Sequence, residues 1–193
     1  MKQNLNNRLL LLLFILPLLG GCVAAAVTAV GAGAAVAVDK RTTGTMIDDQ
    51  SIEFKAATAI ANDKTLGDNI HVNVTSYNGM VLVTGEATSE ALRDQVIEIV
   101  RNIPKVNHVY DEISIAAPSS LMSRSSDALL TTKVKTRLLA DEKVSGLNIK
   151  VVTDKGAVYL MGLVKRAEAD QATDIARRTG GVQKVVKLFQ YTD

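Results

Sequence analysis

The sequence predicts an α+β protein of two tandem domains, each an α-β-β-α-β unit with a three-stranded mixed sheet covered by two helices. The first observation is an internal repeat at an offset of 77 residues: Ile70–Val74 resembles Leu147–Val151, and Gly79–Gly85 resembles Gly156–Gly162. The second is that apolar residues at helical spacing flank these strand-like segments in each copy. The third is that turn residues divide each segment into two strands.

The first 21 residues have the pattern of an export signal and are predicted to lie outside the fold. Two basic residues precede the apolar run Leu9–Leu19, which is too short to span a membrane comfortably. The run ends in Gly20-Gly21-Cys22, and small residues before a cysteine suit the enzymes that acylate the thiol and cleave the signal. Cys22 is the only cysteine, so an internal disulfide is impossible. We predict a signal peptide over 1–21 and fatty acylation, palmitate included, at Cys22, where several chains would anchor durably.

The next segment, 22–45, is predicted to be a flexible tether between the lipid and the domains. Val23–Val38 contains only Ala, Val, Gly and one Thr, and it has no clear period. A small-residue helix lying against the membrane is the alternative, and the uncharged composition is compatible with both. Asp39–Thr45 would form the polar end of the tether.

The first domain is placed at 46–117. Its opening helix carries Ile52, Ala56 and Ile60 at helical spacing, and Asn78-Gly79 predicts a hairpin turn because both residue types tolerate positive φ. A second helix and a last strand complete the unit, marked respectively by Leu92, Val96, Ile99 and Ile103, and by Val109, Ile113 and Ile115.

The second domain is placed at 123–193, after a linker at 118–122 that includes Pro118-Ser119-Ser120. The same elements recur in the same order. The first helix carries Leu130, Val134 and Leu138, the hairpin turn falls at Lys155-Gly156, and the last strand contains Val185, Val186, Leu188 and Phe189. A sheet of three strands needs its apolar face covered, and two helices per copy can cover it.

This repeat, with glycines at each hairpin and at the end of each second strand, resembles the BON domain. The residues that carry the match are Gly79, Gly85, Gly156 and Gly162, with the Val-rich segments around them and the strings Thr131-Thr132-Lys133-Val134 and Tyr159-Leu160-Met161-Gly162-Leu163-Val164. With the acylation signal, the chain is similar to lipoproteins that carry two BON domains. The resemblance implies a lipid-anchored protein of the outer membrane that faces the periplasm, binds phospholipid, supports envelope integrity and is found at division sites. Val23, where an aspartate would favour retention at the inner membrane, agrees with that location.

No catalytic or cofactor-binding pattern emerges, so we expect a protein that is not an enzyme and needs no cofactor or metal. His71 and His108 each sit alone in a strand without a second ligand at useful spacing, and we expect both to face solvent. There is no Gly-x-Ser-x-Gly motif and no phosphate-binding loop. Nucleic acid is excluded as a partner because the chain without its signal is neutral on average and is predicted to be exported.

Charge is distributed unequally between the two domains. Residues 46–117 hold five basic and eleven acidic residues, and residues 118–193 hold thirteen basic and eight acidic residues. Net charges of −6 and +5 predict different partners for the two domains.

The first helix of the second domain is the predicted site of membrane contact. With Leu130, Val134 and Leu138 directed into the core, the remaining faces carry apolar and basic side chains together. Such a helix suits an anionic membrane, with phosphatidylglycerol and cardiolipin as the expected phospholipids. The predicted lipid-binding residues are Ala128, Leu129, Thr132, Lys133, Lys135, Thr136, Arg137 and Leu139.

Two comparisons bear on this interpretation. The matching helix of the first domain has Ala57 and Ala59 where the second has Lys135 and Arg137, so the basic patch is confined to the second domain. The alternative is that Leu129 and Leu139 pack against the first domain and the lysines are an ordinary solvated face. A different function, a periplasmic adaptor that binds cell-wall or division proteins, is also compatible with the charge asymmetry.

Overall fold

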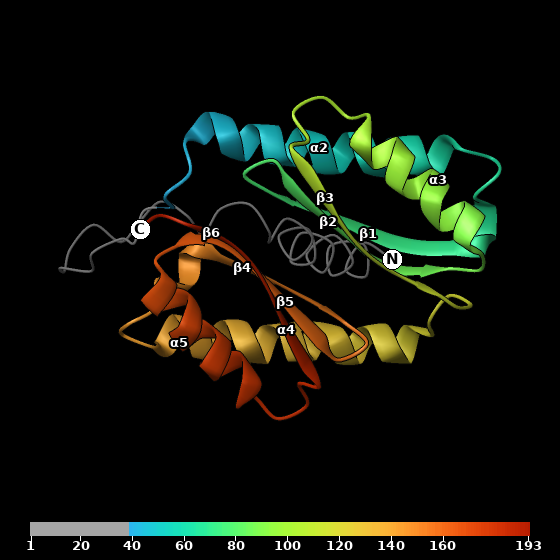
Figure 1. The fold of residues 1–193 in the computed structure, drawn as a ribbon. Helices are drawn as coiled ribbons and strands as arrows, with labels where there is room; N and C mark the ends of the chain where they lie inside the picture. Colours follow the sequence, from blue (N-terminus) through green and yellow to red (C-terminus); the bar gives the residue numbers. More distant parts are fainter. Residues whose placement is uncertain (1–38) are drawn as a thin grey trace, which may run out of the picture. The chain divides into compact units, whose positions relative to one another are not determined.

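The computed structural model describes residues 39–193, drawn in colour in Figure 1. The predicted signal peptide at 1–21, the acylation site at Cys22 and all of the tether up to residue 38 lie outside the described residues. None of the helices in the described part of the chain is long and apolar enough to cross a membrane.

Each repeat has the predicted α-β-β-α-β order, and this confirms the fold class. In each sheet the first two strands are antiparallel and the second and third are parallel, so both sheets are mixed. The middle strand of each sheet is the second strand of the repeat, and the third strand joins it through the second helix. The first repeat consists of α2 (Thr43–Asn62), β1 (Ile70–Tyr77), β2 (Met80–Ala87), α3 (Glu90–Arg101) and β3 (His108–Ile115). The second consists of α4 (Leu121–Ala140), β4 (Ile149–Asp154), β5 (Ala157–Val164), α5 (Arg166–Arg177) and β6 (Lys184–Tyr191).

The first helix of each repeat starts earlier than the sequence pattern indicates. α2 begins at Thr43, and the Thr42 side chain accepts a hydrogen bond from the N–H of Thr45. α4 begins at Leu121, and the Ser120 side chain accepts from the N–H of Ser123. Threonine and serine are favoured caps because their hydroxyls satisfy N–H groups that have no partner inside the helix. The last residues of the predicted tether and linker therefore belong to helices.

Both hairpins turn at the predicted dipeptides, and an aspartate from the first helix holds each turn. All four turn residues, Asn78, Gly79, Lys155 and Gly156, have positive φ. In the first repeat Asp49 accepts hydrogen bonds from the N–H groups of Asn78 and Gly79 at 2.7 and 3.0 Å. Asp127 does the same for Lys155 and Gly156, both at 2.9 Å. Each aspartate thereby fixes its first helix to the hairpin beneath it.

The glycine inside each second strand, Gly85 or Gly162, permits close backbone contact. A Cβ atom on Gly85, whose φ is +121°, would overlap the carbonyl oxygen of His71, and one on Gly162 would lie 2.6 Å from the carbonyl oxygen of Asn148. Only glycine lets the neighbouring strand approach this closely.

The helices cover the outer face of each sheet, and the inner faces of the two sheets meet. Figure 1 shows α2 with α3 on one side, α4 with α5 on the other, and both sheets between them. Separate apolar cores lie beneath each pair of helices. A third apolar cluster joins the inner faces, with Tyr77 and Leu82 from the first repeat and Tyr159, Met161 and Leu188 from the second. The repeats thus form a four-layer arrangement with a shared interior.

Candidate functional site

α4 presents all eight of the predicted lipid-binding residues on its exposed surface. Leu130, Val134 and Leu138 are buried in the core of the second repeat, as the helical spacing predicts. Because they point inward, Leu129 and Leu139 remain 66% and 50% exposed. The alternative in which these leucines pack against the first repeat is therefore wrong.

The exposed apolar surface extends further than the sequence interpretation proposed. Leu121 and Met122 are 75% and 79% exposed in the first turn of α4. The sequence interpretation places both in the linker at 118–122, but Ser120 caps the helix and α4 therefore already includes them. We define the α4 outer face as Leu121, Met122 and the eight predicted residues Ala128, Leu129, Thr132, Lys133, Lys135, Thr136, Arg137 and Leu139.

Two shallow hollows lie along one flank of the α4 outer face. One of about 510 Å³ is lined by Thr132, Lys133, Thr136 and Arg137 with the Thr179-Gly180 loop. The other, of about 520 Å³, also reaches Lys133 and Leu129 and is bounded by Gly180 and Gly181. Arg137 is oriented by a 3.0 Å hydrogen bond that its guanidinium donates to the carbonyl oxygen of Arg178. Cationic and apolar side chains thus lie beside concave surface there. The sequence interpretation did not include the Thr179-Gly180 loop in the site, because the loop is far from α4 along the chain.

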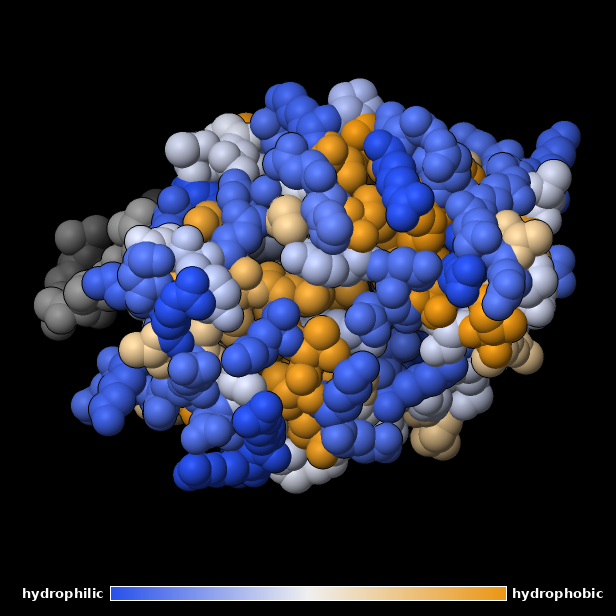
Figure 2. All heavy atoms as spheres, viewed as in Figure 1, coloured by the Kyte–Doolittle hydropathy of each residue, from blue (hydrophilic) through white to orange (hydrophobic). Residues whose placement is uncertain are grey.

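α2 offers a contrasting surface. Ile47 and Phe54 are 61% and 73% exposed on it. The positions equivalent to Lys135 and Arg137 hold Ala57 and Ala59, so α2 carries one lysine, Lys55, where α4 has a cluster of three basic residues. Figure 2 shows the side of the molecule that carries α3 and α5, where apolar surface lies in patches among hydrophilic side chains. The combination of exposed leucines and a basic cluster is therefore a property of α4.

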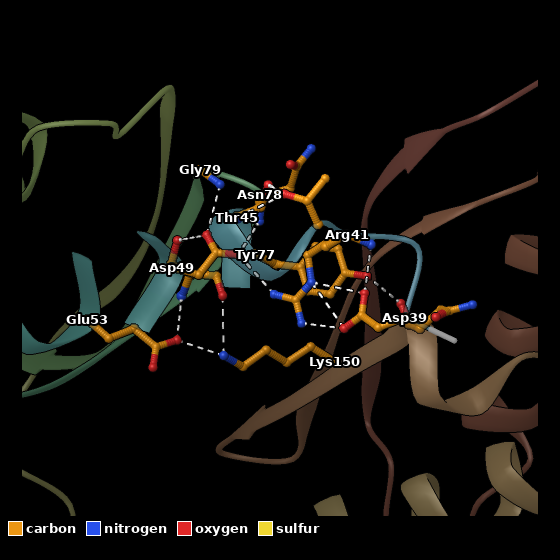
Figure 3. Close-up of polar contacts among 12 residues, drawn as sticks. Asp39, Arg41, Thr45, Asp49, Glu53, Tyr77, Asn78, Gly79 and Lys150 are labelled. Carbon is orange, nitrogen blue, oxygen red and sulfur yellow. Dashed lines mark hydrogen bonds and ion pairs between the residues drawn. The ribbon is translucent and has the colours of Figure 1, made fainter. Parts of the chain in front are cut away.

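A cluster of charged groups joins the start of the described chain to both repeats (Figure 3). Arg41 forms ion pairs with Asp39 at 2.7 Å and with Asp49 at 2.9 Å. Its guanidinium lies 3.9 Å from the centre of the Tyr77 ring, and the Tyr77 hydroxyl donates to the carbonyl oxygen of Asn148 in the second repeat. We call Asp39, Arg41, Asp49, Tyr77 and Asn148 the joint cluster.

Hydrogen bonding keeps the carboxylates of the joint cluster charged. The bond from the Arg41 guanidinium holds the pKa of Asp39 below its ordinary value. Burial raises the pKa of Asp49, but bonds from the Gly79 N–H, the Ser76 hydroxyl, the Asn78 N–H and Arg41 outweigh it and leave the pKa lowered. Both groups are therefore anionic at neutral pH.

Part of the opposite charge on the two repeats is used between the repeats themselves. Lys150 pairs with Glu53 at 2.6 Å, and Lys155 pairs with the fully buried Glu86 at 2.9 Å. Tyr159 donates to Glu112 at 3.2 Å, and burial followed by the nearby Glu112 charge raises the Tyr159 pKa. The charge asymmetry thus serves the joint as well as any external partner.

The histidines differ from each other in their surroundings. His108 is exposed as expected and meets the Tyr110 ring edge-on, with centroids 4.6 Å apart. His71 is only half-buried, so the expectation of a solvent-facing ring holds in part, and its ring lies 3.1 Å from the Arg124 guanidinium. Within residues 39–193 no three histidine, cysteine or acidic side chains gather as a metal site would require.

Comparison with known proteins agrees with this architecture. The BON domain model matches residues 48–117 and 126–193. The chain is 38% identical over 187 residues to the outer membrane lipoprotein DolP of Haemophilus influenzae, covering 97% of both chains. It is 34% identical over 154 residues to the 21 kDa hemolysin of Actinobacillus pleuropneumoniae (80% of this chain, 79% of the relative), and 28% identical over 145 residues to the osmotically-inducible protein Y of Escherichia coli (74% and 72%).

Solved structures offer only remote likeness. The C-terminal domain of CdsD, a structural protein of the type III secretion system of Chlamydia trachomatis, matches 77% of this chain and 98% of its own length, with a TM-score of 0.31 at 11% identity. The assignment therefore rests on the sequence matches, and these support an outer-membrane lipoprotein. The chain belongs to the BON-domain family, as a DolP-like protein with two BON domains.

Proposed function

We propose that the protein binds anionic phospholipid through the α4 outer face while acyl chains on Cys22 hold it at the periplasmic side of the outer membrane. The observation that carries this proposal is the exposure of Leu121, Met122, Leu129 and Leu139 beside Lys133, Lys135 and Arg137. Leucine and methionine side chains can enter the lipid boundary while the cations meet headgroup phosphates. By its likeness to DolP, such binding would serve envelope integrity at division sites.

The hollows beside α4 indicate where a headgroup would lie. Lys133 and Arg137 are one helical turn apart and line the same hollow, so one phosphate could contact both. Each basic residue near an anionic surface contributes about 1 kcal/mol, which corresponds to roughly a fivefold change in affinity. Phosphatidylglycerol and cardiolipin both supply such phosphates.

Vesicle co-sedimentation tests the proposal. The chain without its signal, carrying Cys22→Ser so that acylation cannot mask weak binding, should sediment with phosphatidylglycerol or cardiolipin vesicles and be released as salt rises. Leu129→Glu should abolish sedimentation, and Lys133→Gln with Arg137→Gln should weaken it by more than tenfold. Phe54→Glu, which makes the same change at an exposed apolar residue of α2, should leave it unchanged. Equal, salt-insensitive binding to phosphatidylcholine would contradict the proposal.

A protein adaptor is the second candidate, and the observation that favours it is the residual negative charge of the first repeat. In that case in-cell crosslinking from α2 should trap one dominant envelope protein. Recovery of lipid alone would count against it.

A further inference from the structure

Among the residues that the structure describes, 39–193, the outer edge of β1 is open for part of its length. Within that range β1 is an edge strand that pairs only with β2. At its end, the Ser76 N–H donates to Glu53 at 2.8 Å and the Ser76 carbonyl accepts from Lys150 at 3.2 Å. The main-chain groups of Ser76 therefore point away from β2 and are satisfied by side chains.

The main-chain N–H and C=O groups of Val72 and Val74 also point away from β2, and within residues 39–193 they have no such partners. Main-chain direction alternates along a strand, so residues two and four before Ser76 share its orientation. The carbonyl of Asn69 accepts a hydrogen bond from the Thr88 N–H, just beyond the end of β2. This confirms that the main-chain groups of the odd-numbered residues point toward β2. Within residues 39–193, no side chain or neighbouring strand bonds the outward groups of Val72 and Val74. Unpaired edge groups of this kind are a template for another strand.

A groove accompanies this open edge. It has a volume of about 560 Å³, and its apolar lining comes from Ile60 and two alanines of α2 and from Ile70, Val72 and Val74 of β1. Glu53, Asp63 and Lys64 also line it. The groove has this width because Ala57 and Ala61 are small, whereas the equivalent positions of α4 hold Lys135 and Leu139.

We propose that an extended segment of a partner protein, with alternating apolar and basic side chains, adds to β1 as a fourth strand. Its main chain would bond Val72 and Val74, and its apolar side chains would enter the groove beside Ala57 and Ala61. An acyl chain offers no alternating donors and acceptors for this edge. A second copy of this chain would bring two repeats of net charge −6 together, so the charge favours a basic partner.

The test uses the full acylated protein in phosphatidylcholine nanodiscs and a fluorescent octapeptide of alternating valine and lysine. Fluorescence anisotropy should show saturable binding, and amide hydrogen exchange over residues 70–76 should slow at least fivefold. Ala57→Leu with Ala61→Leu fills the groove without changing charge and should weaken binding at least tenfold. Thr58→Leu, an exposed residue of α2 outside the groove lining, is the matched control and should have no effect.

Two further arms separate the alternatives without altering the protein. A peptide N-methylated at every amide, so that neither of its edges keeps N–H donors, should bind at least tenfold more weakly, and a valine–glutamate peptide should not bind. Equal binding of the N-methylated peptide, or of any peptide to the filled variant, would overturn strand addition. If anionic vesicles slow amide exchange at 70–76, the edge binds lipid. If raised protein concentration slows it without peptide, the edge binds a second copy of the chain. Either result would also overturn the proposal.

Discussion

Asp49 and Asp127 occupy equivalent positions in the first helices, yet their surroundings make them unequal. Both accept hydrogen bonds from two N–H groups of a hairpin turn. Asp49 is only 3% exposed and also pairs with Arg41 and the Ser76 hydroxyl, whereas Asp127 is half-buried. A carboxylate that is buried with its partners costs more to remove than one at the surface.

Asp49→Asn should lower the free energy of unfolding by about 2–3 kcal/mol at pH 7, because Arg41 loses a buried partner. Asp127→Asn should cost about 1 kcal/mol. Denaturant unfolding of the two variants measures the difference, and equal losses would contradict it.

The same residue predicts a pH dependence. The folded pKa of Asp49 is lowered, so its contribution is complete above the unfolded pKa of about 3.9 and is lost as the pH falls toward the folded value. Denaturation series between pH 7 and pH 3 should show the wild type losing stability more steeply below pH 4 than Asp49→Asn does. Parallel curves would show that Asp49 does not titrate with folding.

The pKa of Asp154 is shifted in the opposite direction to that of Asp49. Burial, followed by the nearby Glu86 charge, raises its pKa, so ionised Asp154 weakens the fold at neutral pH. Asp154→Asn should therefore raise stability at pH 7, by on the order of 0.5 kcal/mol for a partly exposed position. The gain should shrink as the pH falls through the raised pKa and the wild-type carboxyl becomes neutral. A loss of stability at pH 7 would reveal a favourable partner for this carboxylate.

At the scale of elements, α4 shows how a helix boundary changes a surface. Starting the helix at Leu121 places two more apolar side chains in line with the predicted residues. Replacing Leu121 and Met122 by Ser should reduce binding to phosphatidylglycerol vesicles by at least fivefold, because both side chains would otherwise enter the lipid boundary. Co-sedimentation measures this, and the thermal midpoint should stay within about 2 °C because neither side chain is buried. Unchanged binding would confine lipid contact to the rest of α4.

The sequence predicts these elements well because each has a local cause. Asn78-Gly79 demands a turn by its own backbone preference, and Leu130, Val134 and Leu138 mark a core face by spacing alone. The joint between the sheets was not predicted because it depends on contacts between distant residues. One signal was nevertheless present: Val81–Val83 and Val158–Met161 are continuously apolar, as strands buried on both faces are. That pattern implies a second layer over each sheet.

At the scale of the whole molecule, the shared interior makes the two repeats depend on each other. Leu82 and Met161 are fully buried where the inner faces meet, and Lys150 and Lys155 cross the joint to acidic partners. A repeat without its neighbour would expose that face and leave Glu86 without its ammonium partner. Separating the two repeats therefore costs free energy.

Thermal unfolding should accordingly show a single transition for both repeats. Met161→Ala should cost about 2–5 kcal/mol by leaving a cavity at the joint, and it should lower the midpoint of that one transition. Calorimetry measures both effects, with Leu139→Ala as an exposed control expected to change stability by less than about 0.5 kcal/mol. Two resolved transitions, with only one of them shifted, would show that the repeats unfold independently.

The bonds that hold Arg41 have a mechanical consequence. Arg41 precedes α2 and is fixed to Asp49 and the Tyr77 ring, and the adjoining Lys40 reaches Glu168 of α5 at 3.5 Å. A force applied along the N-terminal chain is therefore resisted first by these side chains, before it reaches the hydrogen bonds in the opening turn of α2. The load passes to the first repeat through Asp49 and Tyr77 and to the second through Glu168, so the helix is protected from being unwound from its end.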